Sequence, residues 1–159
     1  MRDSRCSFVA VGSDLDVSSK IRNWCARAER SPEQVRKKLH DWGAGDQSDR
    51  WIAALQEEDY VNPKRFAKAF VHDHLEFRNW GPAKIMSALT QVHRISGDQV
   101  RQALAEQGKE AVDAAALRAA QSWRRLRPDA PRHKAIAALS RKGFSMDCAL
   151  RAAEATEAD

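Results

Sequence analysis

The amino-acid sequence predicts an all-α protein made of three tandem three-helix, helix-turn-helix-like repeats that form an elongated, curved array. Three observations lead to this fold class. Only 7 Gly and 5 Pro occur among the 159 residues, and the composition is rich in Ala, Arg, Leu, Glu, Gln and Lys, which are good helix formers. Apolar residues recur at helical spacings of three and four. The same apolar pattern then returns about every 50 residues.

The repeat is clearest in the leucines. Leu39, Leu89 and Leu139 are separated by 50 residues each, and the residues one helical turn before them are also apolar. Prolines lie near the three expected starts of the second helix, at Pro32, Pro82 and Pro131. Chance produces some coincidences of this kind in any amphipathic helical protein, but the shared helix starts favour a true repeat. Units of about 50 residues bury little surface, so neighbouring units are expected to stabilise one another.

These patterns divide the chain into five segments. We predict a flexible leader at 1–17, three-helix repeats at 18–60, 61–108 and 109–155, and a frayed tail at 156–159. The leader shows no sustained apolar period and carries scattered Ser, Asp and Gly residues. The tail has no apolar face.

The first repeat has recognisable helix starts. Ser18 or Ser19 can cap its first helix. Ser31 and Pro32 open the second helix, because the hydroxyl can accept a hydrogen bond from an unpaired N–H and proline suits the first turn. The third helix is expected from about Asp46 to Glu58. The residues expected to face the core are Ile21, Trp24, Cys25, Ala28, Val35, Leu39, Trp42, Trp51, Ile52 and Leu55.

The second repeat contains the most strongly patterned stretch of the chain. Pro63 can open a helix because its missing N–H falls where helical N–H groups have no partner. Four aromatic residues then recur at spacings of four, four and three, on one face that is expected to be buried: Phe66, Phe70, His74 and Phe77. Gly81 and Pro82 end this helix and start the next, whose inner residues are Ile85, Met86 and Leu89.

The third repeat is expected to begin near Ala111. Its first helix should turn four residues inward, namely Leu117, Ala120, Trp123 and Leu126. Two prolines mark 127–131 as a loop. The next helix starts near Pro131 and ends at Lys142 and Gly143, because glycine favours the residue after a helix C-terminus. Ser145 can cap the last helix.

Composition also argues against a membrane protein, a secreted protein and a disulfide-linked protein. No apolar run approaches the ~20 residues that span a bilayer, and the patch at 8–11 is shorter than the ~7–15 residues of a secretory signal core. We therefore expect a cytoplasmic protein without a membrane partner. The three cysteines, at 6, 25 and 148, are odd in number and form no CxxC pair. Cys25 and Cys148 are interpreted as small apolar packing residues.

Positive charge is concentrated after the first repeat. Residues 1–62 carry 10 basic and 11 acidic side chains, whereas 63–108 carry 7 against 4 and 109–159 carry 10 against 7. The net charge is therefore −1 for the first of these segments and +3 for each of the others. This distribution favours an anionic partner, either a nucleic acid or an acidic protein surface, although a solvated basic face is also common.

The middle of the chain resembles a known family. Tyr60-Val61, Arg65-Phe66-Ala67, Ala69-Phe70-Val71, and Gly81-Pro82 with Ile85 and Leu89 are similar to the signature of the RecX regulatory family, small bacterial proteins that modulate the recombinase RecA. Upstream, the first repeat carries similar residues at Ser31, Val35, Lys38 and Leu39. The resemblance extends from about Lys20 to about Ala153. Two segments depart from the signature: Asn62-Pro63 replaces an acidic pair, and 92–95 lacks the glycine expected after the second helix.

No motif for catalysis is apparent. The chain has neither GxxxxGK[ST] nor GxGxxG, which argues against a nucleotide hydrolase. His72 and His74 point about 200° apart on a helix, so they cannot share a metal ion. His74 is interpreted as a histidine at the edge of the core and His72 as exposed. We therefore expect no catalytic residue, no metal site and no cofactor.

Basic residues are the better functional candidates. Arginine presents a planar fork to carboxylate or phosphate and keeps its charge. The candidate partner-binding residues are Arg65, Lys68, Arg78, Lys84, Arg124, Arg125, Arg127, Arg141 and Lys142. For each one a solvated surface position is the simpler interpretation, and Arg65 could also form a structural ion pair with Glu57, Glu58 or Asp59.

The sequence leaves two functions open. The resemblance implies a non-catalytic regulator, expected here as a monomer, that lies along the RecA–DNA filament, touches more than one protomer, and opposes filament extension, ATP turnover and recombinase activity. The alternative is a module that binds single- or double-stranded DNA non-specifically, because three-helix units resemble helix-turn-helix domains. Direct DNA binding should weaken steeply with salt. Residues 97–106 hold few side chains able to read bases.

Overall fold

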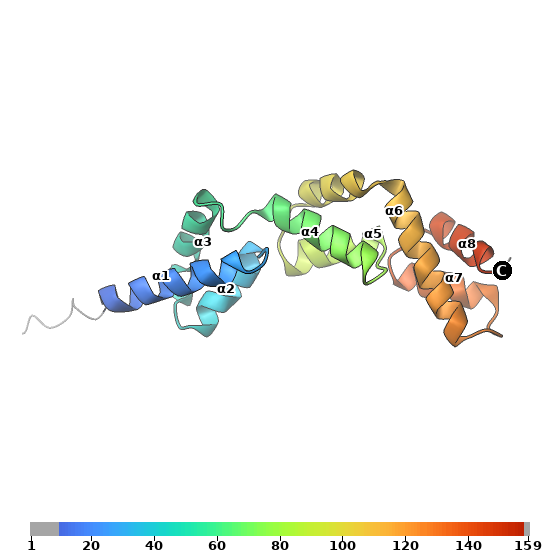
Figure 1. Ribbon diagram of the computed structural model, residues 1–159, viewed down its shortest axis with the longest axis horizontal. Coiled ribbons are helices and arrows are strands. Elements are labelled where there is room, and N and C mark those ends of the chain that lie inside the picture. Colours follow the sequence, from blue (N-terminus) through green and yellow to red (C-terminus); the bar gives the residue numbers. More distant parts are fainter. Residues whose placement is uncertain (1–9, 158–159) are drawn as a thin grey trace, which may run out of the picture. The chain divides into compact units, whose positions relative to one another are not determined.

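The structure is a computed structural model that describes residues 10–157, with side chains from residue 14 onward. All regular secondary structure in this range is helical, which confirms the all-α prediction. In chain order the elements are α1 (Ala10–Ala26), α2 (Pro32–Asp41), a 3₁₀ turn η1 (Gly45–Gln47), α3 (Ser48–Glu57), α4 (Pro63–Glu76), α5 (Pro82–Ser87), a π-helical segment η2 (Ala88–Val92), α6 (Gly97–Leu126), α7 (Arg132–Arg141) and α8 (Met146–Ala155) (Figure 1).

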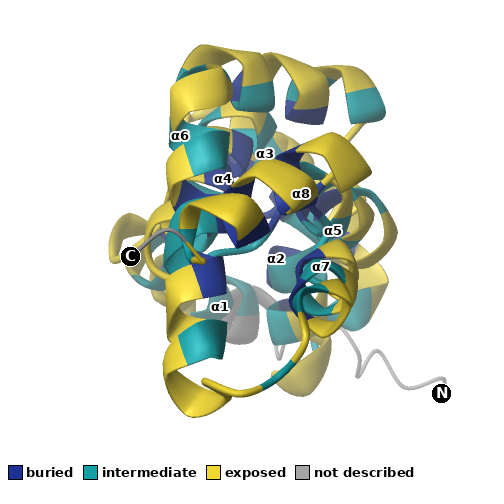
Figure 2. Ribbon diagram, turned by 90° about the vertical axis from the view of Figure 1, so that its right-hand side faces the viewer, coloured by how far each residue is buried: buried dark blue, intermediate teal, exposed yellow. Residues whose placement is uncertain are grey.

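The chain divides into two compact units, residues 1–63 and residues 64–159. The predicted boundaries between three repeats remain a prediction, since each unit has one core of its own. Figure 2 shows buried residues as dark blue stripes on helices whose other sides are exposed. No helix within residues 10–157 is long and apolar enough to cross a membrane.

The first unit packs α1, α2 and α3 around one cluster. Its fully buried side chains include Ile21, Leu39 and Leu55. Ser31 fixes the start of α2 with a capping box: its Oγ accepts a hydrogen bond from the Gln34 N–H at 3.2 Å, and the Gln34 side-chain oxygen accepts one from the Ser31 N–H at 3.0 Å. Two N–H groups at the N-terminus of α2 thereby have partners, and the Ser31 hydroxyl has the capping role that the sequence predicted.

Helix α1 begins earlier than expected. It starts at Ala10, so the predicted cap at Ser18 or Ser19 is wrong, because both serines lie inside the helix. The flexible leader at 1–17 stays a prediction, and residues 1–9 lie outside the described residues. Lys20 pairs with Asp16 at 2.6 Å one turn earlier, and Val17 packs against the core. An ion pair at this spacing supports the helix without producing an apolar stripe in the sequence.

Two residues of the first unit are more exposed than predicted. Trp42 is 36% exposed because it is the C-cap of α2, beyond the last inward turn of that helix. Ala28 is exposed because α1 has already ended at Ala26. In both cases the apolar residues continue at helical spacing in the sequence after the helix itself has ended. The other predicted inner residues of this unit are buried, apart from Trp24, which packs at the edge of the core.

The second unit contains helices α4 to α8 around one shared core. Leu89 and Leu139, which the sequence placed in two different repeats, both belong to it. Two three-helix groups therefore bury one another's apolar faces, as expected for units too small to be stable separately.

The buried stripe of α4 is rotated from the predicted one. Phe66 is buried, but Phe70 and His74 are half-buried and Phe77 is 72% exposed. Leu75, which the aromatic pattern did not include, is 2% exposed. Phe77 lies beyond the last residue of α4, and the chain turns away two residues later at Asn79, whose φ is 49°. A side chain past the helix end no longer follows the helical spacing.

Helix α6 is bent at Gly108, where φ is 81° and ψ is 167°. After this break the helix buries alanines: Ala115, Ala116, Ala119 and Ala120. Of the four residues predicted to face inward only Ala120 is buried. Leu117 and Trp123 are half-buried and Leu126 is 76% exposed. Small side chains allow α6 to approach α7 and α8 closely, so the larger residues lie at the edge of the contact.

The turns between helices of the second unit depend on backbone conformation and on capping residues at the helix ends. Arg94 has a φ of 57°, in the segment that lacks the glycine expected there, so an arginine adopts a backbone conformation that glycine would take at lower cost. Gly143 follows α7 with a φ of 93°, and Ser145 Oγ accepts a hydrogen bond from the Cys148 N–H at 3.3 Å. The sequence predicted both the end of α7 at Gly143 and the cap of α8 at Ser145. Pro131 caps α7, which itself begins at Arg132.

Candidate partner-binding surface

Two glycines bring the start of α5 against the end of α7. The Gly81 N–H donates to the Lys142 carbonyl at 2.7 Å, and the Ala83 N–H donates to the Gly143 carbonyl at 3.1 Å. A Cβ added at Gly81 would lie 2.2 Å from the Gly143 carbonyl carbon, so neither alanine nor any larger residue fits there without displacing backbone. We call this pair of backbone contacts the glycine clasp. It fixes side chains of α5 and α7 beside one another.

A hollow of about 430 Å³ lies beside the glycine clasp. It is lined by Trp80, Lys84, Ser87, Ala88, Gln91, Val92, Arg141 and Gly143. The Lys84 Nζ lies 4.1 Å from the centroid of the Trp80 ring, which is a cation–π contact. Val92 is 63% exposed. This hollow therefore combines a cationic wall with apolar surface.

A second hollow of about 450 Å³ shares Arg141 with the first. Its lining is Trp123, Arg127, Ala130, Lys134, Ala137 and Arg141. The Arg127 guanidinium carbon lies 5.6 Å from the centroid of the Trp123 ring. Since Arg141 lines both, the two hollows are adjacent. We call them together the basic groove and define it by Trp80, Lys84, Trp123, Arg127, Lys134 and Arg141.

The basic groove has one sign of charge. Four of its defining residues are Lys or Arg, and no acidic residue is among the described residues that line either hollow. Cations facing a concave surface without acidic neighbours attract anions, and the two indole rings add flat apolar area.

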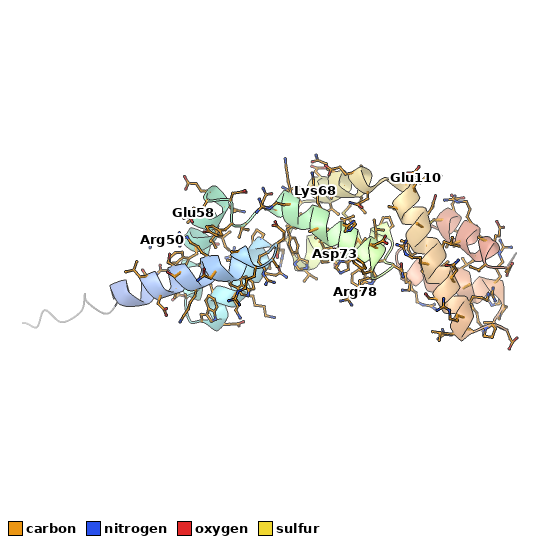
Figure 3. The ribbon with its side chains drawn as sticks, viewed as in Figure 1. Arg50, Glu58, Lys68, Asp73, Arg78 and Glu110 are labelled. Carbon is orange, nitrogen blue, oxygen red and sulfur yellow. The ribbon has the colours of Figure 1, made fainter. Side chains whose placement is uncertain are left out.

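The structure brings together only some of the predicted binding residues. Lys84, Arg127 and Arg141 line the basic groove. Lys142 is half-buried and contributes its carbonyl to the glycine clasp. On α4, Lys68 pairs with Glu106 at 2.8 Å, Arg65 is half-buried, and Arg78 is exposed just after the helix ends (Figure 3). None of the last three residues lines either hollow.

Arg124 has a structural position instead. Its side chain is 21% exposed and donates to the Ala130 carbonyl at 2.7 Å, with a weaker contact to the Pro128 carbonyl at 3.4 Å. It also pairs with Glu157 at 3.4 Å. Arg124 therefore holds the loop between α6 and α7, whereas its neighbour Arg125 is exposed.

Three residues of the basic groove were absent from the sequence-based candidates: Trp80, Trp123 and Lys134. Lys134 could have been found, because Lys134, Ala137 and Arg141 follow at spacings of three and four on one side of α7. Trp123 was predicted to be in the core, and its position at the rim follows from the alanine face of α6.

Among residues 10–157 no group of three or more His, Cys, Asp or Glu side chains could hold a metal ion. His74 is half-buried and stacks on Phe70 with ring centroids 3.7 Å apart, while His72 is exposed. Burial, together with a hydrogen bond that the thiol donates to Asp113, raises the pKa of Cys148 to about 11. Burial likewise raises the pKa of Cys25 to about 11. Both cysteines are buried packing residues, as predicted.

Comparisons with known proteins agree with this fold. Residues 64–104 match the family model described as the second three-helix domain of RecX. A curated relative, the regulatory protein RecX of Leuconostoc mesenteroides, is 26% identical over 132 residues, which cover 80% of this chain and 49% of the relative. The chain thus spans about half the length of that curated relative.

Two solved structures share the fold. The crystal structure of RecX from Lactobacillus salivarius matches with a TM-score of 0.76 at 18% identity, covering 93% of this chain and 99% of that one. A crystal structure of a regulatory protein RecX matches with a TM-score of 0.74 at 17% identity, covering 93% of this chain and 79% of that one.

Proposed function

We propose that this chain is a regulatory protein of the RecX type, which regulates the recombinase RecA by binding along the RecA–DNA filament. The family model, which matches residues 64–104, and the curated relative bear out the resemblance seen in the sequence. In this proposal the chain acts as a monomer, without catalysis or a cofactor. It opposes extension of the filament and lowers both ATP turnover and strand exchange.

The observation that best supports the proposal is the basic groove. A RecA–DNA filament carries nucleic-acid phosphates, and a surface with four cations and no acidic lining residue suits an anionic partner. Contacts of this kind are individually weak, but they add up once the first has formed, because the second then occurs at high effective concentration.

The test is RecA ATP turnover on single-stranded DNA with increasing amounts of the purified chain. We expect turnover to fall at concentrations well below those needed to coat the DNA. Lys84→Gln combined with Arg141→Gln should weaken the inhibition, while Lys68→Gln with Arg101→Gln, which removes the same charge from outside the basic groove, should not. Unchanged turnover and unchanged strand exchange at saturating protein would refute the proposal.

A second candidate function is non-specific binding of nucleic acid without RecA. The indole rings beside cations in the basic groove favour it, since nucleic-acid-binding surfaces combine positive charge with aromatic rings. Inhibition that appears only when the DNA is saturated with this chain would support simple competition for DNA. Inhibition at lower concentrations would support docking on the filament.

A further inference from the structure

We propose that the basic groove holds a single-stranded nucleic acid, with a base stacked on Trp123 and phosphates placed along Lys84, Arg127, Lys134 and Arg141. This inference deepens the second candidate function, on which it rests, by assigning the strand a site and a chemistry. It is independent of whether RecA is bound as well.

The charges of the groove suit a phosphodiester backbone. The four cations are spread over both hollows, with Arg141 at their junction. Within the described part of the chain none of the four pairs with a carboxylate, in contrast to Lys68, Arg118 and Arg151 of the same unit, which pair with acidic residues. Cations that are not paired with carboxylates within the protein can neutralise phosphates of a bound strand and release their counterions.

The walls of the groove favour a strand with flat bases over an acidic peptide. Trp123 lies beside Ala130 and Ala137 in one hollow, and Trp80 lies beside Ala88 and Val92 in the other. Carboxylates of an acidic peptide would satisfy the cations but leave these apolar walls in water. A nucleic-acid strand alternates charged phosphates with flat bases, and base stacking on an aromatic ring tolerates any base sequence.

Trp123 is the better stacking platform of the two indoles. Trp80 already contacts the Lys84 ammonium at 4.1 Å and the His74 ring at 4.6 Å between centroids. The guanidinium carbons nearest to Trp123 are more distant, at 5.6 Å for Arg127 and 5.8 Å for Arg124. We therefore assign Trp123 to a base and Trp80 to holding the Lys84 ammonium in position.

The same features favour a single strand over a duplex. Bases of a duplex are paired and stacked on one another, so their faces cannot reach a tryptophan. Reading a duplex would require a helix with base-contacting side chains in the major groove. The basic groove instead combines one side of α7 with side chains of α5 and η2 and the C-terminal part of α6.

The experiment measures binding of a labelled oligothymidine of about 15 nucleotides, and of a duplex of the same length, to the full chain at several salt concentrations. We expect tighter binding of the single strand. Four phosphate contacts predict a slope of log K against log salt of about −2.8. Lys134→Gln should reduce the slope by about 0.7, whereas the control Lys109→Gln, which removes the same charge from an exposed position on α6, should leave it unchanged.

Substitutions of Trp123 test whether a base stacks on its ring. Trp123→Leu should lower affinity for the single strand by about 5- to 150-fold without changing the salt slope, and Trp123→Phe should restore most of the loss. Thermal unfolding followed by circular dichroism identifies any variant that is merely unfolded. In that case the slope of the Lys134→Gln variant still decides the outcome.

Three results would overturn the inference: equal or tighter binding of the duplex, an equal effect of Lys109→Gln and Lys134→Gln, or competition by polyglutamate as effective as by the unlabelled strand. The RecA assay separates the two proposals. Absence of binding to bare oligonucleotide together with inhibition of RecA would refute the inference and leave the proposed regulator intact. Binding of the strand without any effect on RecA would do the reverse.

Discussion

Phe70 lies between two histidine rings at the edge of the core. Its ring stacks on His74 with centroids 3.7 Å apart, and its edge meets His93 at 5.2 Å. The side chain is half-buried and packs against the core of the second unit. Sequence spacing gave this residue the same weight as Phe66, which is buried, because spacing identifies a face of a helix but not the depth of each position.

We expect Phe70→Ala to lower the free energy of unfolding by about 2–3 kcal/mol, less than the ~3–5 kcal/mol of a fully buried phenylalanine, because part of the ring is already in water. Chemical denaturation provides the measurement. Phe77→Ala serves as the control, since that ring is 72% exposed and its removal should cost less than about 0.5 kcal/mol. Equal losses for the two variants would contradict the burial described for α4.

His93 gives the second unit a dependence on pH. Burial of its ring lowers the pKa of His93 below the ordinary value, and the nearby His74 lowers this pKa further. Because the folded state has the lower pKa, the unfolded state binds the proton more readily. The stabilisation by neutral His93 is therefore complete above the unfolded pKa and is lost as the pH falls through the folded pKa.

The expected result is a lower melting temperature of the wild-type chain at about pH 5.5 than at about pH 7.5. His93→Phe keeps an aromatic ring against Phe66 and Phe70 but cannot be protonated, so its melting temperature should change less over the same interval. His133→Gln alters an exposed histidine of α7 and should leave the wild-type dependence unchanged. Parallel curves for wild type and His93→Phe would exclude His93 as the cause.

At the scale of secondary-structure elements, the glycine clasp positions the basic groove. Gly81 has a φ of −84° and a ψ of 164°, values that any residue adopts, so its role is steric. The restriction comes from Gly143, whose carbonyl carbon would lie 2.2 Å from an added Cβ. No local pattern in the sequence reveals such a contact, because the two glycines are 62 residues apart.

Gly81→Ala should therefore lower the free energy of unfolding by about 3 kcal/mol, and it should weaken partner binding at temperatures where the variant stays folded. Denaturation and oligonucleotide binding are the two measurements. The control is Gly97→Ala at the start of α6, where an added Cβ would meet only the movable end of Arg101 at 3.3 Å. We expect this control to change stability by less than about 0.5 kcal/mol; a comparable loss in both variants would argue against the clasp.

The positions of the helices were largely predictable from the sequence. Which side chains of each helix are buried or exposed was less predictable. Caps such as Ser31 and Ser145 act within one turn, so their residue types are sufficient to place them. The exposure of Leu126 and the rim position of Trp123 depend on how closely α6 approaches its neighbours, which is a tertiary property. For the same reason charge alone identified Lys84, Arg127 and Arg141 but could not separate them from the loop-holding Arg124.

At the scale of the whole molecule, the sequence repeat and the cores do not coincide. Three repeats of about 50 residues were expected to stabilise one another. The second and third groups of helices do share one core, whereas the first group has a separate core built from residues between Ile21 and Val61. A repeat in the sequence shows which positions are equivalent, but the division into cores depends on which apolar faces meet.

This division predicts that residues 64–159 fold without the first unit. Every buried residue of their core, from Phe66 to Ala152, lies within that range, and so does the whole basic groove. We expect the fragment to show a helical circular dichroism spectrum and a cooperative thermal transition. Its affinity for single-stranded oligonucleotide should be within about twofold of the full chain, because the cations counted in the salt slope are all retained.

The complementary fragment 10–63 is the natural comparison, since its smaller core leaves it marginal at best. A fragment 64–159 that is unfolded would show that the first unit contributes to the stability of the second. A folded fragment with a reduced salt slope would instead place phosphate contacts on the first unit, whose net charge is close to zero. Retention of both fold and slope would locate binding in residues 64–159, and RecA assays on this fragment would then show whether regulation requires the first unit.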